Sequence, residues 1–174
     1  MRVLSEEGKA VHLFHRQELN LAGIYDRYAD MLYRLALSYL RCDEDARDAV
    51  QDVFIKLVEH NPAFRDDEHE RAWLVRATIN RSCDLLRRRS VRASLPLDEV
   101  THLPAQASDE AQDVLDCLSR VPETYRAAIT LHDLEGFSVE ETARMLGVSQ
   151  SAVKMRLQRG RLQLKAQWEE EHHV

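Results

Sequence analysis

The sequence predicts an all-α protein with two small helical domains, an N-terminal helical bundle and a C-terminal helix-turn-helix domain, joined by a flexible linker. Gly and Pro are scarce, five and four among 174 residues, which favours helices over sheets. Apolar residues recur at helical spacing through two long stretches. A segment between these stretches has two prolines and little periodicity.

These patterns divide the chain into four parts. Residues 1–18 have weak periodicity and form an N-terminal arm, and residues 19–90 form the first domain. Residues 91–109 form the linker, because irregular segments longer than about 12–15 residues are usually functional or disordered. Residues 110–170 form the second domain.

Three helices are predicted in the first domain. The first spans 19–40, and its apolar positions are Leu21, Ile24, Tyr28, Met31, Leu32 and Leu35. The second begins at Asp43, a good cap residue, and ends at Asn61-Pro62. Its apolar stripe is Ala46, Ala49, Val50, Val53, Phe54, Leu57 and Val58, and its other face is acidic. The third runs from about Arg71 to Arg89.

The third helix has a basic polar side. The residues on that side are Trp73, Arg76, Asn80, Arg81, Asp84, Arg87 and Arg88. Arginines hold phosphates, asparagine reads base edges and an aromatic ring stacks on an unpaired base. This side therefore suits a nucleic-acid surface, although Trp73 fits a core position equally well.

The second domain carries a helix-turn-helix pattern. Pro122 starts a helix that Gly136 terminates, and Ser138 and Glu141 form a capping box before the next helix. Gly147 supplies the left-handed backbone of the turn, and Ser149 caps the last helix.

The last helix has one apolar and one basic face. The apolar stripe is Val153, Leu157, Gly160 and Leu164, and there is no acidic residue from Ser149 to Trp168. A DNA duplex attracts Lys and Arg by counterion release, and such a helix fits the major groove. A merely solvated basic face is the alternative, but helix, turn, cap and charge agree with one another on DNA binding.

Other classes of function find little support in the residues. No Gly-rich phosphate loop, nucleophile elbow or HExxH motif occurs, so we expect no catalytic residues and no cofactor. The histidine pairs at 12/15 and 172/173 lack partners at fixed spacing, so we expect no metal site. The three cysteines form no CxxC pair, and no apolar run approaches membrane-spanning length. We expect no signal peptide, because the first residues are too polar for one. A reduced, cytoplasmic protein is the simplest expectation.

Four stretches together resemble the extracytoplasmic-function (ECF) sigma factors, the two-domain class of bacterial sigma factors with regions 2 and 4. They are DARDAVQDVFIKL, WLVRATINRSCDLLRRR, VPETYRAAITLHDLEGFSVEETARMLGVS and SAVKMRLQRGRLQLK. The resemblance covers roughly Leu19 to Lys165. It implies a protein that binds core RNA polymerase and directs promoter-specific initiation through a melted −10 element and a duplex −35 element.

The resemblance also implies roles for individual residues. The candidates for −35 DNA are Ser151, Lys154, Met155, Gln158 and Arg159. The candidates for the −10 strand are Phe64, Arg65, Arg76, Asn80, Asp84 and Arg87. The candidates for docking on the clamp coiled coil of the largest polymerase subunit are Asp48, Gln51 and Asp52. An anti-sigma factor is a further implied partner.

Some positions depart from the family pattern. The family usually has Ser at Met155 and Ala at Gly160, and often has Gly-Thr at Ser151-Ala152. Gly inside a helix costs about 1 kcal/mol relative to Ala. Ile79 stands where a basic or small residue is common.

Two other hypotheses stay open at this point. One is a helix-turn-helix regulator with a helical sensing domain, which need not bind core polymerase. The other is a helical interaction protein that has lost DNA binding. A pull-down with core polymerase and promoter-dependent run-off transcription distinguish them.

Overall fold

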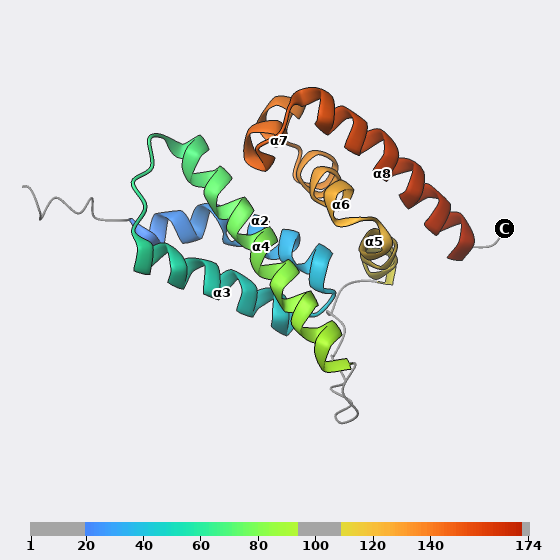
Figure 1. Cartoon of the computed structure of the whole chain (residues 1–174), viewed down its shortest axis with the longest axis horizontal. Helices are drawn as coiled ribbons and strands as arrows, with labels where there is room; N and C mark the ends of the chain where they lie inside the picture. The colour runs from blue at the N-terminus through green and yellow to red at the C-terminus, as the bar shows by residue number, and fades with distance from the viewer. Residues whose placement is uncertain (1–19, 94–108, 172–174) are drawn as a thin grey trace, which may run out of the picture.

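The computed structural model describes residues 20–93 and 109–171, and these are helical with short connections. The first domain contains α2 (Leu21–Leu40), α3 (Asp43–His60) and α4 (Asp67–Ala93). The second contains α5 (Asp109–Arg120), α6 (Glu123–Ile129), η2 (Thr130–Leu134), α7 (Val139–Leu146) and α8 (Gln150–Glu171) (Figure 1). The predicted all-α class is confirmed. The predicted arm and most of the linker lie outside the described residues.

The first domain is a three-helix bundle in which each helix packs against the other two. Leu32, Leu35, Leu57 and Leu74 are fully buried at its centre. Burying a leucine side chain contributes about 1.5–3 kcal/mol to stability, so these four leucines help to hold the three helices together. Arg41, with a left-handed φ of 55°, ends α2 and turns the chain into α3.

The predicted start of α3 at Asp43 is confirmed, but the cap role predicted for Asp43 and the predicted start of α4 are wrong. Cys42, not Asp43, occupies the position before α3, and Asp43 lies in the first turn. The Tyr33 hydroxyl donates to the Asp43 carboxylate at 2.6 Å, so that carboxylate links α3 to α2 instead of capping its own helix. Helix α4 begins at Asp67, ahead of the predicted Arg71, because the Asp66 carboxylate accepts the backbone N–H of His69 at 2.7 Å.

The helix predicted from Pro122 to Gly136 is interrupted. Its first part, α6, is an α-helix, and η2 is a π-helical turn in which Glu135 N–H donates to Thr130 O at 3.0 Å. A π turn inserts a residue and so shifts the phase of the side chains that follow. Leu131 is fully buried, whereas Asp133 bonds to α8.

The helix-turn-helix geometry follows the sequence closely. Both hydrogen bonds of the Ser138–Glu141 capping box are present, and Gly147 has a φ of 67°. Ser149 Oγ accepts the N–H of Ala152 at 3.1 Å at the start of α8. On α8, Val153 and Leu157 are buried as predicted.

Gly160 has a packing role that its helix propensity does not show. A Cβ at this position would lie 2.7 Å from Ile129 Cδ1 and 3.0 Å from Tyr125 Cβ. Both distances are shorter than normal carbon contacts of about 3.5–4.0 Å. The glycine therefore lets α8 approach α6 closely.

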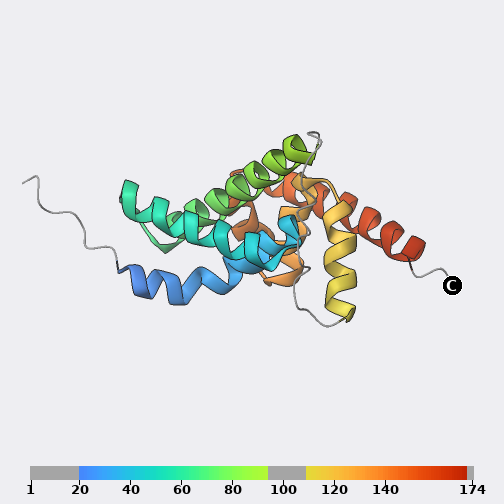
Figure 2. The same ribbon diagram turned by 90° about the horizontal axis from the view of Figure 1, so that it is seen from below.

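The two domains pack directly against each other. Helix α4 contacts α7, and α2 contacts α5, α6 and η2. Ala127, Leu131 and Met145 of the second domain belong to the same buried apolar cluster as the core of the first. Figure 2 shows the second domain against α2 and α4, with the C-terminal end of α8 pointing away from the first domain.

Candidate nucleic-acid and polymerase interfaces

The candidate −35 face lies on the outside of α8. Its five residues, Ser151, Lys154, Met155, Gln158 and Arg159, are all exposed. The turn at Gly147 and the cap at Ser149 fix the start of the helix, and Val153 and Leu157 hold its inner side on the domain core. The first three turns of α8 therefore expose two cationic side chains, two polar side chains and the thioether of Met155. This set of groups can contact the groove of a DNA duplex.

The basic character of α8 is partly neutralised further along the helix. The Arg161 guanidinium binds the Asp133 carboxylate through Nε at 2.9 Å and Nη2 at 2.5 Å. Lys165 Nζ lies 3.6 Å from Glu169 Oε1. Within residues 20–93 and 109–171, the cationic side chains of α8 that have no carboxylate partner therefore lie in its N-terminal half.

The candidate −10 residues are divided between exposed and half-buried positions. Arg65, Asn80, Asp84 and Arg87 are exposed on α4 or in the loop before it, whereas Phe64 and Arg76 are half-buried. The Arg87 guanidinium lies 3.2 Å from the Asp84 carboxylate.

Trp73, for which the sequence left a core position and a nucleic-acid surface open, lies at the edge of the core. It is half-buried and packs against the core, and its ring lies 6.0 Å from that of Phe64 in an edge-on arrangement. The His69 ring also lies edge-on to the Phe64 ring, with 5.6 Å between the two ring centres. An aromatic cluster therefore stands where the loop enters α4.

Arg81 does not belong to a free cationic face, contrary to the sequence prediction. Its Nε donates to the Asp52 carboxylate of α3 at 2.6 Å, and Arg89 likewise pairs with Asp45. These arginines join α4 to the acidic helix inside the domain. The helical-wheel pattern could not distinguish them from Arg87 and Arg88, which are exposed.

The candidate polymerase face lies on α3. Asp48 and Gln51 are exposed, whereas Asp52 is half-buried by its pairing with Arg81. Phe54 is buried, as predicted.

An apolar groove lies beside this face and was missed by sequence reasoning. Its volume is about 820 Å³, and it is lined between α2 and α3 by residues that include Tyr25, Ile55 and Val58. Val58 was assigned to the buried stripe, but 51% of its surface is exposed, and 47% of that of Ile55. The signal was present in the spacing, because positions 51, 55 and 58 share one face of a helix.

Hydrogen bonding and burial shift the pKa of several groups near these faces. Burial and the bond to Asp43 raise the pKa of Tyr33 to about 12. Hydrogen bonds from the Ser138 backbone and hydroxyl lower the pKa of Glu141. Burial and the Glu123 carboxylate raise the pKa of the Cys83 thiol to about 11, so this thiol stays protonated at neutral pH.

Neither a metal-ligand cluster nor a membrane-spanning helix is found in the described part of the chain. Within residues 20–93 and 109–171, no three His, Cys, Asp or Glu side chains are grouped to hold a metal ion. None of the helices described there has the length and apolar character needed to span a bilayer.

Comparisons with known proteins agree with this architecture. Residues 24–92 match the family model of sigma-70 region 2, and residues 111–164 match that of sigma-70 region 4. The ECF RNA polymerase sigma factor SigM of Mycobacterium tuberculosis is 36% identical over 143 residues, which cover 81% of this chain and 73% of SigM. RNA polymerase sigma factor SigZ of Bacillus subtilis is 31% identical over 153 residues, covering 84% and 86%.

Solved structures of two proteins in complexes are also similar to this chain. CnrH, in complex with the cytosolic domain of CnrY, superposes with a TM-score of 0.63 and 29% identity, covering 84% of this chain and 85% of that one. The sigma factor RpoE, in complex with the anti-sigma factor NepR from Bartonella quintana, gives 0.59 and 28%, covering 78% and 88%. The chain belongs to the ECF family of RNA polymerase sigma factors, which direct promoter-specific transcription.

Proposed function

We propose a division of labour in which α8 reads the duplex −35 element, α4 and its preceding loop hold the melted −10 strand, and α3 docks on core polymerase. The observation that carries this proposal is the N-terminal half of α8, where five side chains suited to DNA are exposed on a helix without a carboxylate through Trp168. The acidic face belongs to α3 in the first domain, whereas α8 belongs to the second domain. The two faces therefore suit partners of opposite charge.

At the −35 element, Lys154 and Arg159 supply charge for phosphates and acceptor groups of guanine. Ser151 and Gln158 supply hydrogen bonds. Met155, 41% exposed, has no hydrogen to donate, so it suits an apolar contact such as a thymine methyl group.

At the −10 element, Asn80 and Arg87 are the exposed groups of α4 that fit base edges and phosphates. Arg65 and the Phe64–Trp73 aromatic cluster stand at the entry to the helix. An unpaired base exposes its edges and one ring face, and such a cluster is suited to stack on it. These groups would hold the non-template strand after it separates.

For polymerase docking, the exposed Gln51 lines the apolar groove of Tyr25, Ile55 and Val58, and the exposed Asp48 lies one turn earlier on α3. A polar rim around an apolar centre is the usual composition of a protein interface. The partner we assign to it is the clamp coiled coil of the largest polymerase subunit. Since RpoE is similar and its structure contains an anti-sigma factor, we also assign this chain an anti-sigma partner.

Run-off transcription with purified core polymerase tests the proposal. Core plus this chain is expected to initiate on a cognate promoter, and core alone is not. A chain that binds the promoter but neither binds core nor supports run-off transcription would instead be a helix-turn-helix regulator. A chain that binds core without promoter-dependent transcripts would be an interaction protein.

A further inference from the structure

Two ion pairs join α4, the helix assigned to the −10 strand, to the docking helix α3. Arg81 directs two nitrogens at one oxygen of Asp52, with Nε 2.6 Å and Nη2 2.5 Å from Oδ2. Arg89 pairs with Asp45, and its Nη1 also donates to Leu40 O at 3.1 Å, where α2 ends. All of the paired side chains are partly buried, so they lie at the edge of the three-helix core.

The spacing of the two pairs matches on the two helices. Asp45 and Asp52 are seven positions apart on α3, or about 10.5 Å along its axis at about 1.5 Å per residue. Arg81 and Arg89 are eight positions apart on α4, or about 12 Å. The earlier residue of α3 pairs with the later residue of α4, so the two helices run antiparallel. Two attachment points fix both the position and the rotation of α4 on α3 more firmly than one would.

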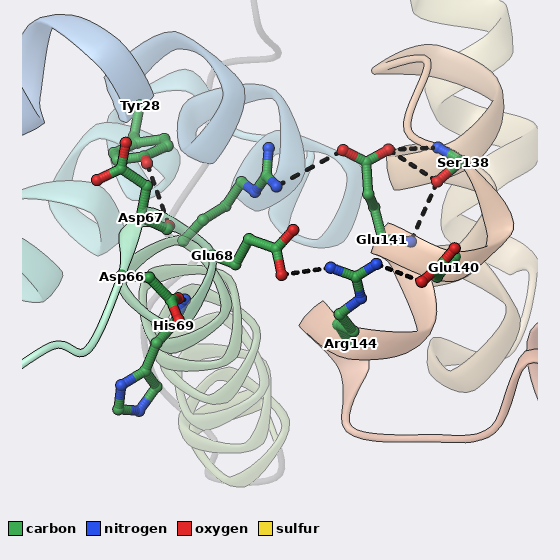
Figure 3. A network of polar contacts seen from close by, with 10 residues as sticks. Tyr28, Asp66, Asp67, Glu68, His69, Ser138, Glu140, Glu141 and Arg144 are labelled. Carbon is green, nitrogen blue, oxygen red and sulfur yellow. Dashed lines mark hydrogen bonds and ion pairs between the residues drawn. The ribbon is translucent and has the colours of Figure 1, made fainter.

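A separate set of contacts holds the start of α4, as Figure 3 shows. The Asp66 carboxylate accepts the N–H of His69, and the Tyr28 hydroxyl of α2 lies 3.5 Å from Asp67 O. Arg27 Nη1 of α2 lies 3.2 Å from the Asp67 carboxylate. The start of α4 is thus attached to α2, whereas the two arginines attach its later turns to α3.

The pairing of Arg81 determines the direction in which the candidate −10 residues point. Successive residues of a helix point about 100° apart around its axis, so Asn80 faces outward when Arg81 faces α3. Asp84 and Arg87 follow Asn80 by one and two turns and are exposed on the same side. A set of binding side chains works only when it is held within about 0.5 Å and 10–20° of the right geometry. A change in the rotation of α4 would therefore misplace all of these side chains at once.

Asp52 connects this attachment to the docking face. It lies one residue after Gln51 and one turn after Asp48, which are both exposed. Its own side chain is 42% exposed although it is bonded to Arg81. The same carboxylate therefore stands between the surface that we assign to polymerase and the helix that we assign to the −10 strand.

We propose that Arg81 and Arg89 are positioning residues for −10 recognition and do not touch the DNA strand themselves. They act through Asp52 and Asp45. This inference rests on the proposed function. The two pairs hold α4 at one rotation on the docking helix, so that Asn80 and its exposed neighbours face the non-template strand when α3 is bound to polymerase. The exposed residues of α4 make the contacts, and the paired arginines set where those contacts are made.

The test measures binding of a single DNA strand by full-length variants at saturating core polymerase. One probe is a fluorescein-labelled strand with the −10 segment of a promoter that the wild type transcribes, and the other has the same bases in permuted order. The variants are Arg81→Ala, Asp52→Ala and the double variant. Asp52→Ala releases Arg81 but leaves the arginine in place, so it separates positioning from direct contact. Saturating core is used because Asp52 also borders the docking face.

Each single variant should bind the −10 strand about fivefold to tenfold more weakly than the wild type, within the range of coupling between residues in contact. The permuted strand should show a smaller change, because phosphate contacts carry no sequence information. The double variant should be no weaker than the single variants, since the loss of either partner already breaks the pair. Arg81→Lys should recover part of the loss, because lysine keeps the charge but lacks the planar fork of arginine.

The second pair and a matched control make the test independent of one site. Arg89→Ala should also weaken binding of the −10 strand, by less than Arg81→Ala because Arg89 lies farther from Asn80. Arg161→Ala removes an arginine–aspartate pair in the second domain, where Arg161 binds Asp133 through two nitrogens. This control should bind the −10 strand like the wild type. Circular dichroism and thermal denaturation should show every variant folded at the assay temperature.

Three results would overturn the proposal. Wild-type affinity for the −10 strand in both single variants, with lower thermal stability alone, would leave the pair a purely structural role. Weaker binding by Arg81→Ala with unchanged or tighter binding by Asp52→Ala would mean that Arg81 contacts the strand itself. Losses that add in the double variant would show that the two residues act separately. Failure of the proposed function looks different, because the wild type with core would then neither bind the −10 strand nor support run-off transcription.

Discussion

Helices α8 and α4 both present basic surfaces, but they are constrained very differently. Helix α8 packs on its own domain along one stripe and leaves the opposite face of its N-terminal half exposed. Helix α4 is in contact with α2 and α3 on one side and with α7 on another, and only its remaining strip is exposed. The exposed face of a helix that is buried on one side can be predicted from the periodicity of its sequence. For a helix that is buried on two sides, periodicity alone does not identify the exposed face.

The largest expected effect is on the exposed face of α8. Lys154→Glu should weaken binding to the −35 duplex about tenfold to a hundredfold, because it replaces a phosphate or base contact by repulsion. Fluorescence anisotropy with a labelled −35 duplex measures this. Lys165→Glu is the matched control, since it makes the same charge change about 16 Å further along the helix at about 1.5 Å per residue. Equal losses in the two variants would mean that net charge alone, and not the face, binds DNA.

The buried side of α8 gives the next effect, and its sign distinguishes two explanations. Helix propensity predicts that Gly160→Ala stabilises the protein by about 1 kcal/mol. The close contacts with Ile129 and Tyr125 predict destabilisation by about 1–3 kcal/mol instead, as for other overpacked sites. Urea denaturation followed by circular dichroism measures the free energy of unfolding. A more stable variant would show that α6 and α8 do not depend on this close approach.

On α4, two arginines of the same basic pattern should separate by role. Arg81→Ala breaks the pair with Asp52 and should lower the free energy of unfolding by up to about 1 kcal/mol, because the pair is partly exposed. Arg87→Ala, whose side chain is 75% exposed, should leave stability unchanged and weaken binding to the −10 strand. Thermal denaturation and strand binding of both variants test this. If Arg81→Ala has wild-type stability, the pair with Asp52 does not stabilise the domain, and Arg81 would again be a candidate for the nucleic-acid surface.

The smallest effect concerns pH. The pKa of Glu141 is lowered in the folded state by hydrogen bonds from Ser138, so its carboxylate stabilises the fold above the unfolded pKa of about 4.3. That stability is lost as the pH falls through the lower folded pKa. The difference in unfolding free energy between wild type and Glu141→Gln should therefore be largest near neutral pH and shrink on acidification. A difference that stays constant down to low pH would show that the carboxylate charge has no part in capping α7.

The sequence predicted those features that depend on neighbours in the chain. The capping box at Ser138, the turn at Gly147 and the buried stripe of α8 are set by residues three to four positions apart. The features that were missed depend on distant residues. Arg34 and Glu135, which are 101 positions apart, could not be paired by any local pattern.

The same distinction applies within the candidate interfaces. The exposed positions of α8 follow from a single period, so the predicted −35 residues all lie on one surface. On α4, Arg76 and Arg81 fall on the polar side of the wheel, yet Arg76 lies beside the second domain and Arg81 binds α3. The roles assigned to individual residues in DNA and polymerase binding stay predictions.

The division of labour between the two helices is tested most directly by a crossed comparison of Asn80→Ala and Lys154→Glu in complex with core polymerase. Each complex is titrated with a −35 duplex and with a single-stranded −10 segment. We predict that Asn80→Ala loses affinity for the −10 strand and retains the −35 duplex, and that Lys154→Glu does the reverse. Loss of both DNAs by either variant, or of neither, would contradict separate recognition by α4 and α8.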